Sequence, residues 1–132
     1  LSPSLLEAAE RGLARDYEPA FGGFGTAPKF PPSSAIELLL RRGGPEALGM
    51  VRRTLDGMAA GGLYDVVGGG FHRYSVDARW VVPHFEKMLY DNGQLLRLYA
   101  EAYRLSANES LLRAPDPGEA LARLLGRGDR SP

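Results

Sequence analysis

The segment "RRGGPEALGMVRRTLDGMAAGG" (residues 41–62) predicts a helix enclosed between two pairs of glycines. Pro45 stands at its first position, where a missing backbone N–H costs no hydrogen bond. An apolar stripe follows at intervals of three and four residues, at Leu48, Val51, Leu55 and Met58. Only Gly43 and Gly44 separate this helix from the residues before it. The short connection predicts an antiparallel pair of helices.

Two helices are expected before this one. The helix on the other side of the short connection starts near Ser33 or Ser34, where Ser34 and Glu37 have the spacing of a capping box. An earlier helix covers residues 2–17, with Ser4 and Glu7 spaced in the same way. Its apolar positions are Leu6, Ala9, Leu13 and Tyr17.

A fourth helix is expected to open at Pro83 and to run to about Leu105. Its apolar face is predicted to contain Phe85, Met88, Leu89, Leu96, Tyr99 and Tyr103. Asn92 falls within this face, where it must either bind a neighbouring backbone group or line a polar cavity. His84 and Asp91 border the face, Glu86 points to solvent, and Lys87 is spaced to pair with Asp91.

The loops between these helices alternate in length and resemble each other. Residues 18–32 and 63–82 form long loops, and Gly22-Gly23-Phe24 recurs 47 residues later as Gly69-Gly70-Phe71. With antiparallel helices, this alternation places both long loops at the same end of the stack. The chain is therefore predicted to be all-α, an array of helical hairpins with long Gly-rich loops at one end.

Composition excludes several classes of protein. The chain has 132 residues, 44% of them apolar, which suits one globular domain. Sixteen basic and sixteen acidic residues balance, so no nucleic-acid partner is expected. Cysteine is absent, and no apolar run approaches the roughly 20 residues of a membrane-spanning helix. We expect a cytoplasmic domain, without membrane contact, that begins inside a longer protein.

Titratable and aromatic residues crowd into "GGGFHRYSVDARWVVPHFEKMLYDN" (residues 68–92), which holds both histidines and the single tryptophan. Residues 71–83 alternate as a short hairpin that turns near Asp77 and Ala78. Phe71, Trp80 and Phe85 are expected to be buried and to fix the loop. The polar residues beside them predict a site for a polar ligand.

The chemistry open to this site is limited. The two histidines lie twelve residues apart with no thiolate near them, so neither a metal nor another cofactor is expected. The glycine runs lack the lysine of a phosphate-binding loop, and no nucleophile elbow is present. Acid–base chemistry remains, with His72, His84 and Asp77 as candidate catalytic residues. The candidate ligand-binding residues are Lys29, Arg73, Tyr74, Trp80, Asp91 and Asn92.

The chain resembles the spermatogenesis-associated protein 20 family in two motifs, "GGFGTAPKFP" (residues 22–31) and residues 68–92. Bacterial members of this family are described as thioredoxin-domain-containing proteins. The resemblance covers about residues 5–112. It implies an N-terminal thioredoxin-like domain, missing here, followed by an (α/α)6 toroid similar to that of N-acylglucosamine 2-epimerase. Residues 1–112 would be about two hairpins of that toroid. Gly93 departs from the alanine that is usual in the family.

Three readings of function follow. The chain is a fragment of a carbohydrate-active or sugar-binding toroid, inactive alone, whose parent is an epimerase, isomerase or glycosidase. Alternatively, it is a non-catalytic interaction module that works with the missing thioredoxin-like domain, or it is a truncated remnant. The ligand would be a small polar molecule such as a sugar. The open edge of the toroid predicts self-association, and residues 113–132 predict a poorly ordered tail.

Overall fold

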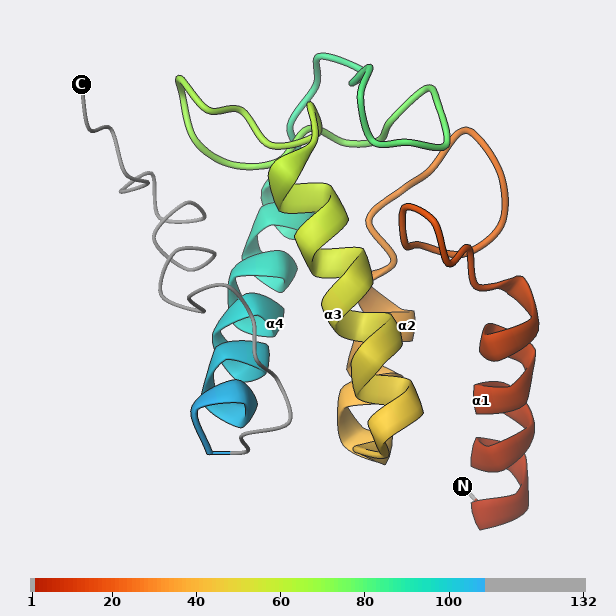
Figure 1. Cartoon of the computed structure of the whole chain (residues 1–132). Coiled ribbons are helices and arrows are strands. Elements are labelled where there is room, and N and C mark those ends of the chain that lie inside the picture. Colours follow the sequence, from red (N-terminus) through yellow and green to blue (C-terminus); the bar gives the residue numbers. More distant parts are fainter. Residues whose placement is uncertain (1, 109–132) are drawn as a thin grey trace.

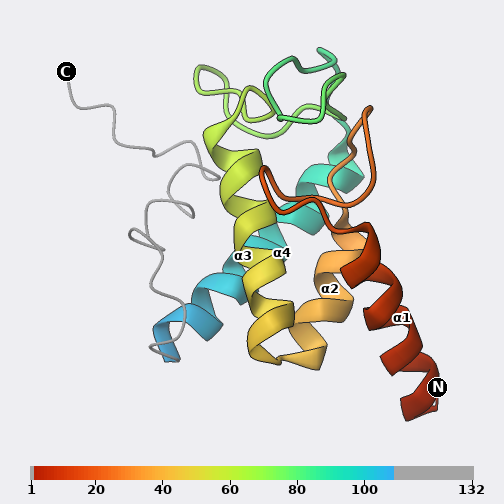
Figure 2. The same ribbon diagram turned by 45° about the vertical axis from the view of Figure 1, so that its right-hand side comes forward.

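The computed structural model describes residues 2–108, which form four helices and, within that range, no β-strands. They are α1 (Pro3–Asp16), α2 (Ser33–Arg42), α3 (Pro45–Ala60) and α4 (Leu89–Asn108). Helices α2, α3 and α4 lie side by side, and α1 flanks α2 (Figures 1 and 2). The prediction of an all-α fold is confirmed for residues 2–108. The predicted tail, residues 113–132, lies outside the described residues.

The hairpin of α2 and α3 forms as the glycine pairs predict. Gly43 ends α2 in the left-handed region at φ 73°, and its N–H donates to the Leu39 carbonyl. Pro45 opens α3 at its first position, and the N–H of Gly61 closes it on the Gly57 carbonyl. The whole predicted stripe of α3 is buried, namely Leu48, Val51, Leu55 and Met58.

Both predicted capping boxes are wrong. The N-cap of α1 is Ser2, two residues before the expected Ser4: the Ser2 side chain accepts the N–H of Leu5 at 3.3 Å, and Ser4 lies within the helix. Pro32 occupies the N-cap of α2 and provides no side-chain bond. No residue of α1 is fully buried, so this helix is held mainly by partial contacts of Leu13 and Ala14 with the core.

α4 begins at Leu89, six residues after the predicted start at Pro83. The intervening residues are extended because they pair with the hairpin before them. The N–H of His84 donates to the Tyr74 carbonyl at 2.9 Å, and the N–H of Arg73 donates to the Glu86 carbonyl at 2.6 Å. Backbone pairing with the preceding arm of the hairpin outweighs the local helical signal of Pro83.

The buried face of α4 also differs from the predicted one. The core receives Leu95, Leu98 and Tyr99, and the hydroxyl of Tyr99 donates to the Leu55 carbonyl at 2.6 Å. The predicted face is therefore wrong at four positions, which are exposed by 38% or more: Phe85, Leu89, Leu96 and Tyr103. Asn92 and Tyr99, two turns apart, are the predicted members that do face the neighbouring elements.

We call residues 17–32 loop 1 and residues 61–88 loop 2; both lie at the same end of the helices (Figure 1). Their first turns are built alike. In loop 1 the N–H of Gly22 donates to the Glu18 carbonyl, and in loop 2 the N–H of Gly69 donates to the Asp65 carbonyl. All four glycines of the two pairs have φ between 79° and 84°. A left-handed pair of this kind strongly favours glycine.

Matching side chains complete each turn. Tyr17 contacts Phe24 at a ring distance of 5.8 Å, and Tyr64 contacts Phe71 at 5.1 Å. The carboxylate of Glu18 accepts the N–H groups of Ala20 and Phe21. The carboxylate of Asp65 accepts those of Val67 and Gly68, 47 residues further along. The internal repeat is thus present in the hydrogen bonds as well as in the sequence.

Two glycines of α3 provide a matched test of how closely the loops approach this helix. A Cβ atom on Gly57 would lie 2.4 Å from the carbonyl oxygen of Phe21, whereas one on Gly49 would meet nothing within 4 Å. We expect Gly57→Ala to lower the free energy of unfolding by about 1–3 kcal/mol. Gly49→Ala should raise it by about 0.5–1 kcal/mol. Urea denaturation of both variants measures this, and equal effects would contradict the close approach.

Candidate functional site

Loops 1 and 2 are joined directly through their backbones. Lys29 and Ser75 exchange two hydrogen bonds, each 2.8 Å long from N to O. Further along loop 2, the N–H of Val76 donates to the Val82 carbonyl at 2.9 Å, which closes the predicted hairpin. The paired backbones of loops 1 and 2 therefore form one connected unit at the end of the helices. We call this unit the frame, and it carries the candidate residues of both loops.

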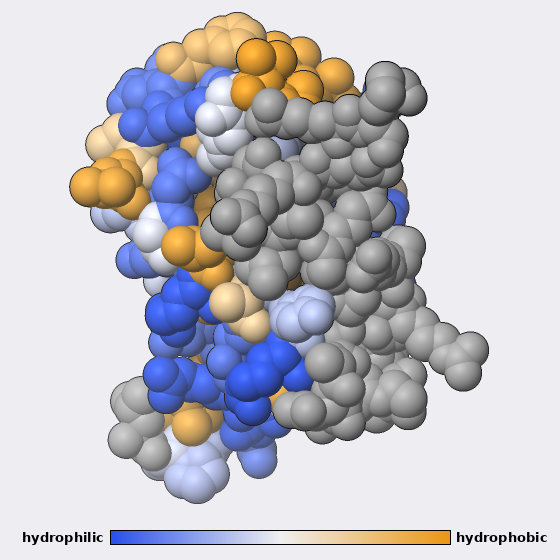
Figure 3. Space-filling model, turned by 90° about the vertical axis from the view of Figure 1, so that its left-hand side faces the viewer, coloured by the Kyte–Doolittle hydropathy of each residue, from blue (hydrophilic) through white to orange (hydrophobic). Residues whose placement is uncertain are grey.

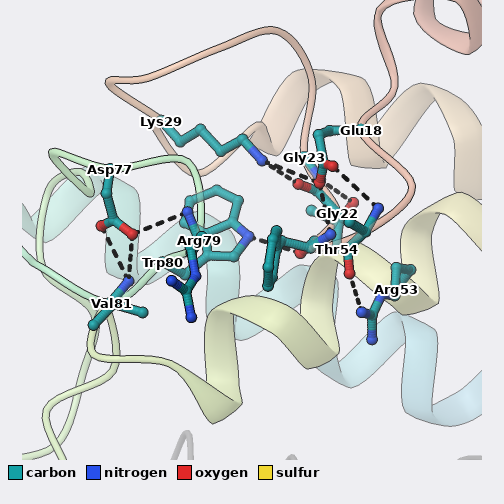
Figure 4. A network of polar contacts seen from close by, with 12 residues as sticks. Glu18, Gly22, Gly23, Lys29, Arg53, Thr54, Asp77, Arg79, Trp80 and Val81 are labelled. Atoms are coloured by element: carbon teal, nitrogen blue, oxygen red, sulfur yellow. Dashed lines mark hydrogen bonds and ion pairs between the residues drawn. The ribbon is translucent and has the colours of Figure 1, made fainter.

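Lys29 is part of this frame and is 2% exposed. Its Nζ donates to the Gly22 carbonyl at 2.6 Å, lies 3.6 Å from Glu18 Oε2 and sits 5.4 Å from the Trp80 ring centroid (Figure 4). Burial lowers the pKa of Lys29, and the Glu18 carboxylate opposes that shift. The ammonium is thus enclosed by the protein's own acceptors and does not face solvent.

Trp80 fills the space between the loops and α3. Its indole Nε1 donates to the Phe21 carbonyl at 2.9 Å, and its side chain is 1% exposed. A Cβ atom on Gly23 would lie 2.8 Å from Trp80 Cζ2, so glycine makes room for the indole. Trp80 is also the one described non-glycine residue with a positive φ, at 62°. Backbone strain of this kind persists only where the surroundings hold it in place.

Asp77 ties together the turn of the loop 2 hairpin. Its carboxylate accepts the Ser75 hydroxyl at 2.6 Å and the N–H groups of Arg79, Val81 and Val82. Burial alone would raise the pKa of Asp77, but the Ser75 hydroxyl and these amides lower it overall. The bonds account for an aspartate here without any ligand. The predicted turn near Asp77 and Ala78 is confirmed.

Asn92 binds the backbone of loop 2. Its Oδ1 accepts the N–H of Phe71 at 2.7 Å, and its Nδ2 donates to the Phe71 carbonyl at 3.1 Å. Of the two alternatives for this residue, the structure therefore shows the backbone contact. Phe71 is 1% exposed, as predicted, whereas Phe85 is 84% exposed, so the prediction that Phe85 fixes the loop is wrong.

His72 is buried beneath Phe85, with the two rings 5.3 Å apart at their centroids. Its Nδ1 has no hydrogen-bond partner among the residues that the structure describes. Burial lowers the pKa of His72, and the nearby Lys87 ammonium lowers it further. Lys87 bonds Asp65 Oδ2 at 2.6 Å, not Asp91 as the helical spacing suggests. A neutral imidazole is thus favoured at pH 7.

His84 lies on the outer side of the frame, at the end of a row of three rings, stacked on Tyr74, which in turn contacts Phe30 at a tilt of 32°. Its imidazole is 4.7 Å from the Tyr74 ring, and Tyr74 is 4.7 Å from Phe30. Glu86 joins this group, since its carboxylate is 3.7 Å from His84 Nδ1 and 3.5 Å from Arg73 Nη1. The expectation that Glu86 simply points to solvent misses these two contacts.

Asp91, on the first turn of α4, lies near Arg73. Burial raises the pKa of Asp91, and the Arg73 charge opposes that shift. The candidates therefore form two groups. Lys29, Asp77, Trp80 and Asn92 hold the frame, and Arg73, Tyr74, His84 and Asp91 lie around it with His72 beneath.

Several residues of the frame were missed from the sequence. Glu18 and Asp65 hold the turns of loops 1 and 2, and Thr54 on α3 accepts the N–H of Gly23 at 2.9 Å. A signal for the two acids was present, since each stands four residues before a Gly-Gly-Phe triplet. Thr54 gave no such signal, because it looks like an ordinary helix residue.

No group of His, Asp and Glu side chains in residues 2–108 is arranged to hold a metal ion. Within the same residues, no helix has the length and apolar character required to cross a bilayer. The expected cytoplasmic location stays a prediction.

Asp77 gives a pH-dependent test of the frame. Its pKa is lower in the folded chain than in the unfolded chain, so its stabilising effect is full above the unfolded pKa of about 3.9 and is lost as pH falls below it. Asp77→Asn should lower the free energy of unfolding by about 1–2 kcal/mol at pH 7. The difference from wild type should shrink between about pH 5 and pH 2.

Urea denaturation across this pH range measures the effect, with Glu46→Gln on the exposed first turn of α3 as the control. A difference between wild type and Asp77→Asn that stays constant with pH would contradict the role given to the carboxylate.

Comparison with known proteins identifies relatives of the chain. No family model matches it. It is 47% identical over 105 residues to human spermatogenesis-associated protein 20 and 45% identical over 105 residues to the mouse protein, in each case over 74% of this chain. It is also 43% identical over 98 residues, 68% of this chain, to uncharacterized protein B0495.5 of Caenorhabditis elegans. The chain spans 13% of the length of each of these relatives, and it is similar to a segment of spermatogenesis-associated protein 20.

Proposed function

We propose that the chain is a segment of a spermatogenesis-associated protein 20 family member and that its loop end binds a small polar ligand of the sugar class. In this proposal, α1 to α4 are part of an (α/α)6 toroid. The identity of 43–47% to these relatives and the repeated turns of loops 1 and 2 support the assignment. The activity of the whole protein would need residues from further hairpins.

The observation that carries the ligand proposal is the row of rings formed by Phe30, Tyr74 and His84. Phe30, at one end of the row, is 51% exposed, so its ring offers apolar surface to solvent. Beside it, the Arg73 guanidinium and the Glu86 carboxylate provide hydrogen-bond donors and acceptors. A flat ring beside a few convergent polar groups suits a sugar, which has both an apolar face and hydroxyl groups.

The frame keeps these side chains in place. Phe30 follows the buried Lys29, and Tyr74 precedes Ser75, so the two-bond pairing of Lys29 with Ser75 fixes both rings from below. His72 and His84 are the candidates for proton transfer. Neutral His72 suits a general base, because its lowered pKa leaves the imidazole unprotonated at pH 7.

A second candidate function, that of an interaction module, is favoured by exposed apolar side chains. Hydrophobic residues gather along the loop end of the face in Figure 3. Four of the apolar side chains are more than 70% exposed, namely Val66, Val67, Phe85 and Leu89. Apolar surface of this kind is typical of contacts with another protein segment, including a second copy of the chain.

Saturation-transfer NMR with glucose and N-acetylglucosamine tests the ligand proposal. We expect transfer to the sugar, and a loss of about three- to tenfold in affinity in Tyr74→Ala and in His84→Gln, because each removes one ring of the row. Tyr90→Ala is the matched control, since Tyr90 is 56% exposed on α4 and lies outside the row. Melting temperatures of all variants should stay close to that of wild type.

Equal weakening by Tyr90→Ala would show that the sugar binds elsewhere. Absence of transfer from wild type, together with concentration-dependent sedimentation that Phe85→Asp abolishes, would favour the interaction module instead.

A further inference from the structure

A groove lies where the last turn of α3 meets the tips of both loops. Its apolar wall is formed by Phe21 of loop 1, by Trp80 and Val81 of loop 2, and by Ala60 of α3. Gly57 and Gly61 line it as well and contribute no side chain. At both glycines the loop backbones approach α3 closely, since an added Cβ atom would lie 2.4 Å from the carbonyl oxygen of Phe21 or of Trp80.

Two arginines stand on the rim of the groove. Arg53 of α3 donates from Nη2 to the Ala20 carbonyl, and Arg79 of loop 2 places its guanidinium carbon 5.4 Å from the Phe21 ring centroid. Figure 4 shows Arg79 beside Trp80, with Arg53 directed toward loop 1. Among residues 2–108, neither arginine has a carboxylate within ion-pair distance.

The charge on the rim is positive overall. Asp56 also lines the groove, but its carboxylate lies 3.7 Å from Arg52 Nε on the same helix. Arg53 and Arg79 keep most of their donors for another group, since a guanidinium has five N–H bonds and, within residues 2–108, one of these bonds is used, by Arg53 toward the Ala20 carbonyl. Paired planar donors of this kind match a carboxylate or a phosphate.

We propose that this groove binds a small anion attached to a flat apolar body, such as an aryl carboxylate or an aryl phosphate. The charged head lies between Arg53 and Arg79, and the ring lies against Phe21 and Val81, above the buried Trp80. Apolar walls with two placed cations are the usual composition of a ligand site for such molecules.

This site is separate from the one proposed for the sugar. Trp80 is its one residue in common with the sequence-derived candidates, and none of the rings in the row of Phe30, Tyr74 and His84 lines it. Binding of an anion here and binding of a sugar there can therefore be measured and lost independently.

The single tryptophan makes the groove easy to observe, because Trp80 forms part of its wall. We would titrate the 132-residue chain with benzoate and with phenyl phosphate while recording tryptophan fluorescence. Benzamide, which has the ring without the charge, and inorganic phosphate, which has the charge without the ring, are the comparison ligands. A saturable change with benzoate or phenyl phosphate, at least about tenfold tighter than with benzamide and inorganic phosphate, is the expected result. The tighter of the two aryl anions identifies the head group.

Three variants locate the binding. Arg79→Gln should weaken binding about tenfold, by loss of a charge-assisted hydrogen bond. Ala60→Leu fills the groove without removing a charge and should abolish binding, which keeps the test informative if Arg79→Gln unfolds. Arg41→Gln is the control, because Arg41 is an exposed arginine of α2 that pairs with Glu37.

Three outcomes would overturn the proposal. One is the absence of a saturable signal with either aryl anion. Another is equal affinity for benzamide, which would make the groove merely apolar. The third is equal weakening by Arg41→Gln, which would indicate nonspecific attraction to positive charge.

Discussion

The loop end of this protein depends on one buried ammonium group. Lys29, 2% exposed, is surrounded by the Gly22 carbonyl, the Glu18 carboxylate and the Trp80 ring. Removing a charge from water is costly unless partners of this kind compensate it. Because the Lys29 backbone also pairs with Ser75, the same residue fixes the turn of loop 1, the indole between the loops and the hairpin of loop 2.

This constraint decides which residues at the loop end can still contact a ligand. Lys29 and Asp77 have few hydrogen bonds left for a ligand, because their polar groups already bond within the frame. Residues held by the frame but facing outward, such as Phe30 and His84 at the two ends of the row of rings, keep part of their surface for other molecules. Loop 2 repeats the turn of loop 1. Its lysine, Lys87, does not stand 47 residues after Lys29, however, and its side chain is more exposed than that of Lys29.

The sequence predicted the helical hairpin well and the start of α4 poorly. Gly43, Gly44 and Pro45 act locally, so their spacing alone predicts where α2 ends and α3 begins. The start of α4 is delayed because residues 82–86 pair with residues 73–76, and the predicted hairpin, which ended at Pro83, did not include that continuation. For the candidate site, residue types pointed to loop 2. They did not distinguish side chains that hold the backbone from those that face outward, because both kinds are polar or aromatic.

Hydrogen exchange of single amides tests most directly whether loops 1 and 2 form one frame built on Lys29. The amide hydrogens of Lys29 and Ser75 bond each other's carbonyls, so they should exchange within about tenfold of the rate for Leu55 in the buried part of α3. Lys29→Met, which removes the ammonium, should speed exchange at Ser75 and at the Trp80 indole together. Fast exchange at Lys29 and Ser75 in the wild-type chain, with Leu55 still protected, would contradict the account.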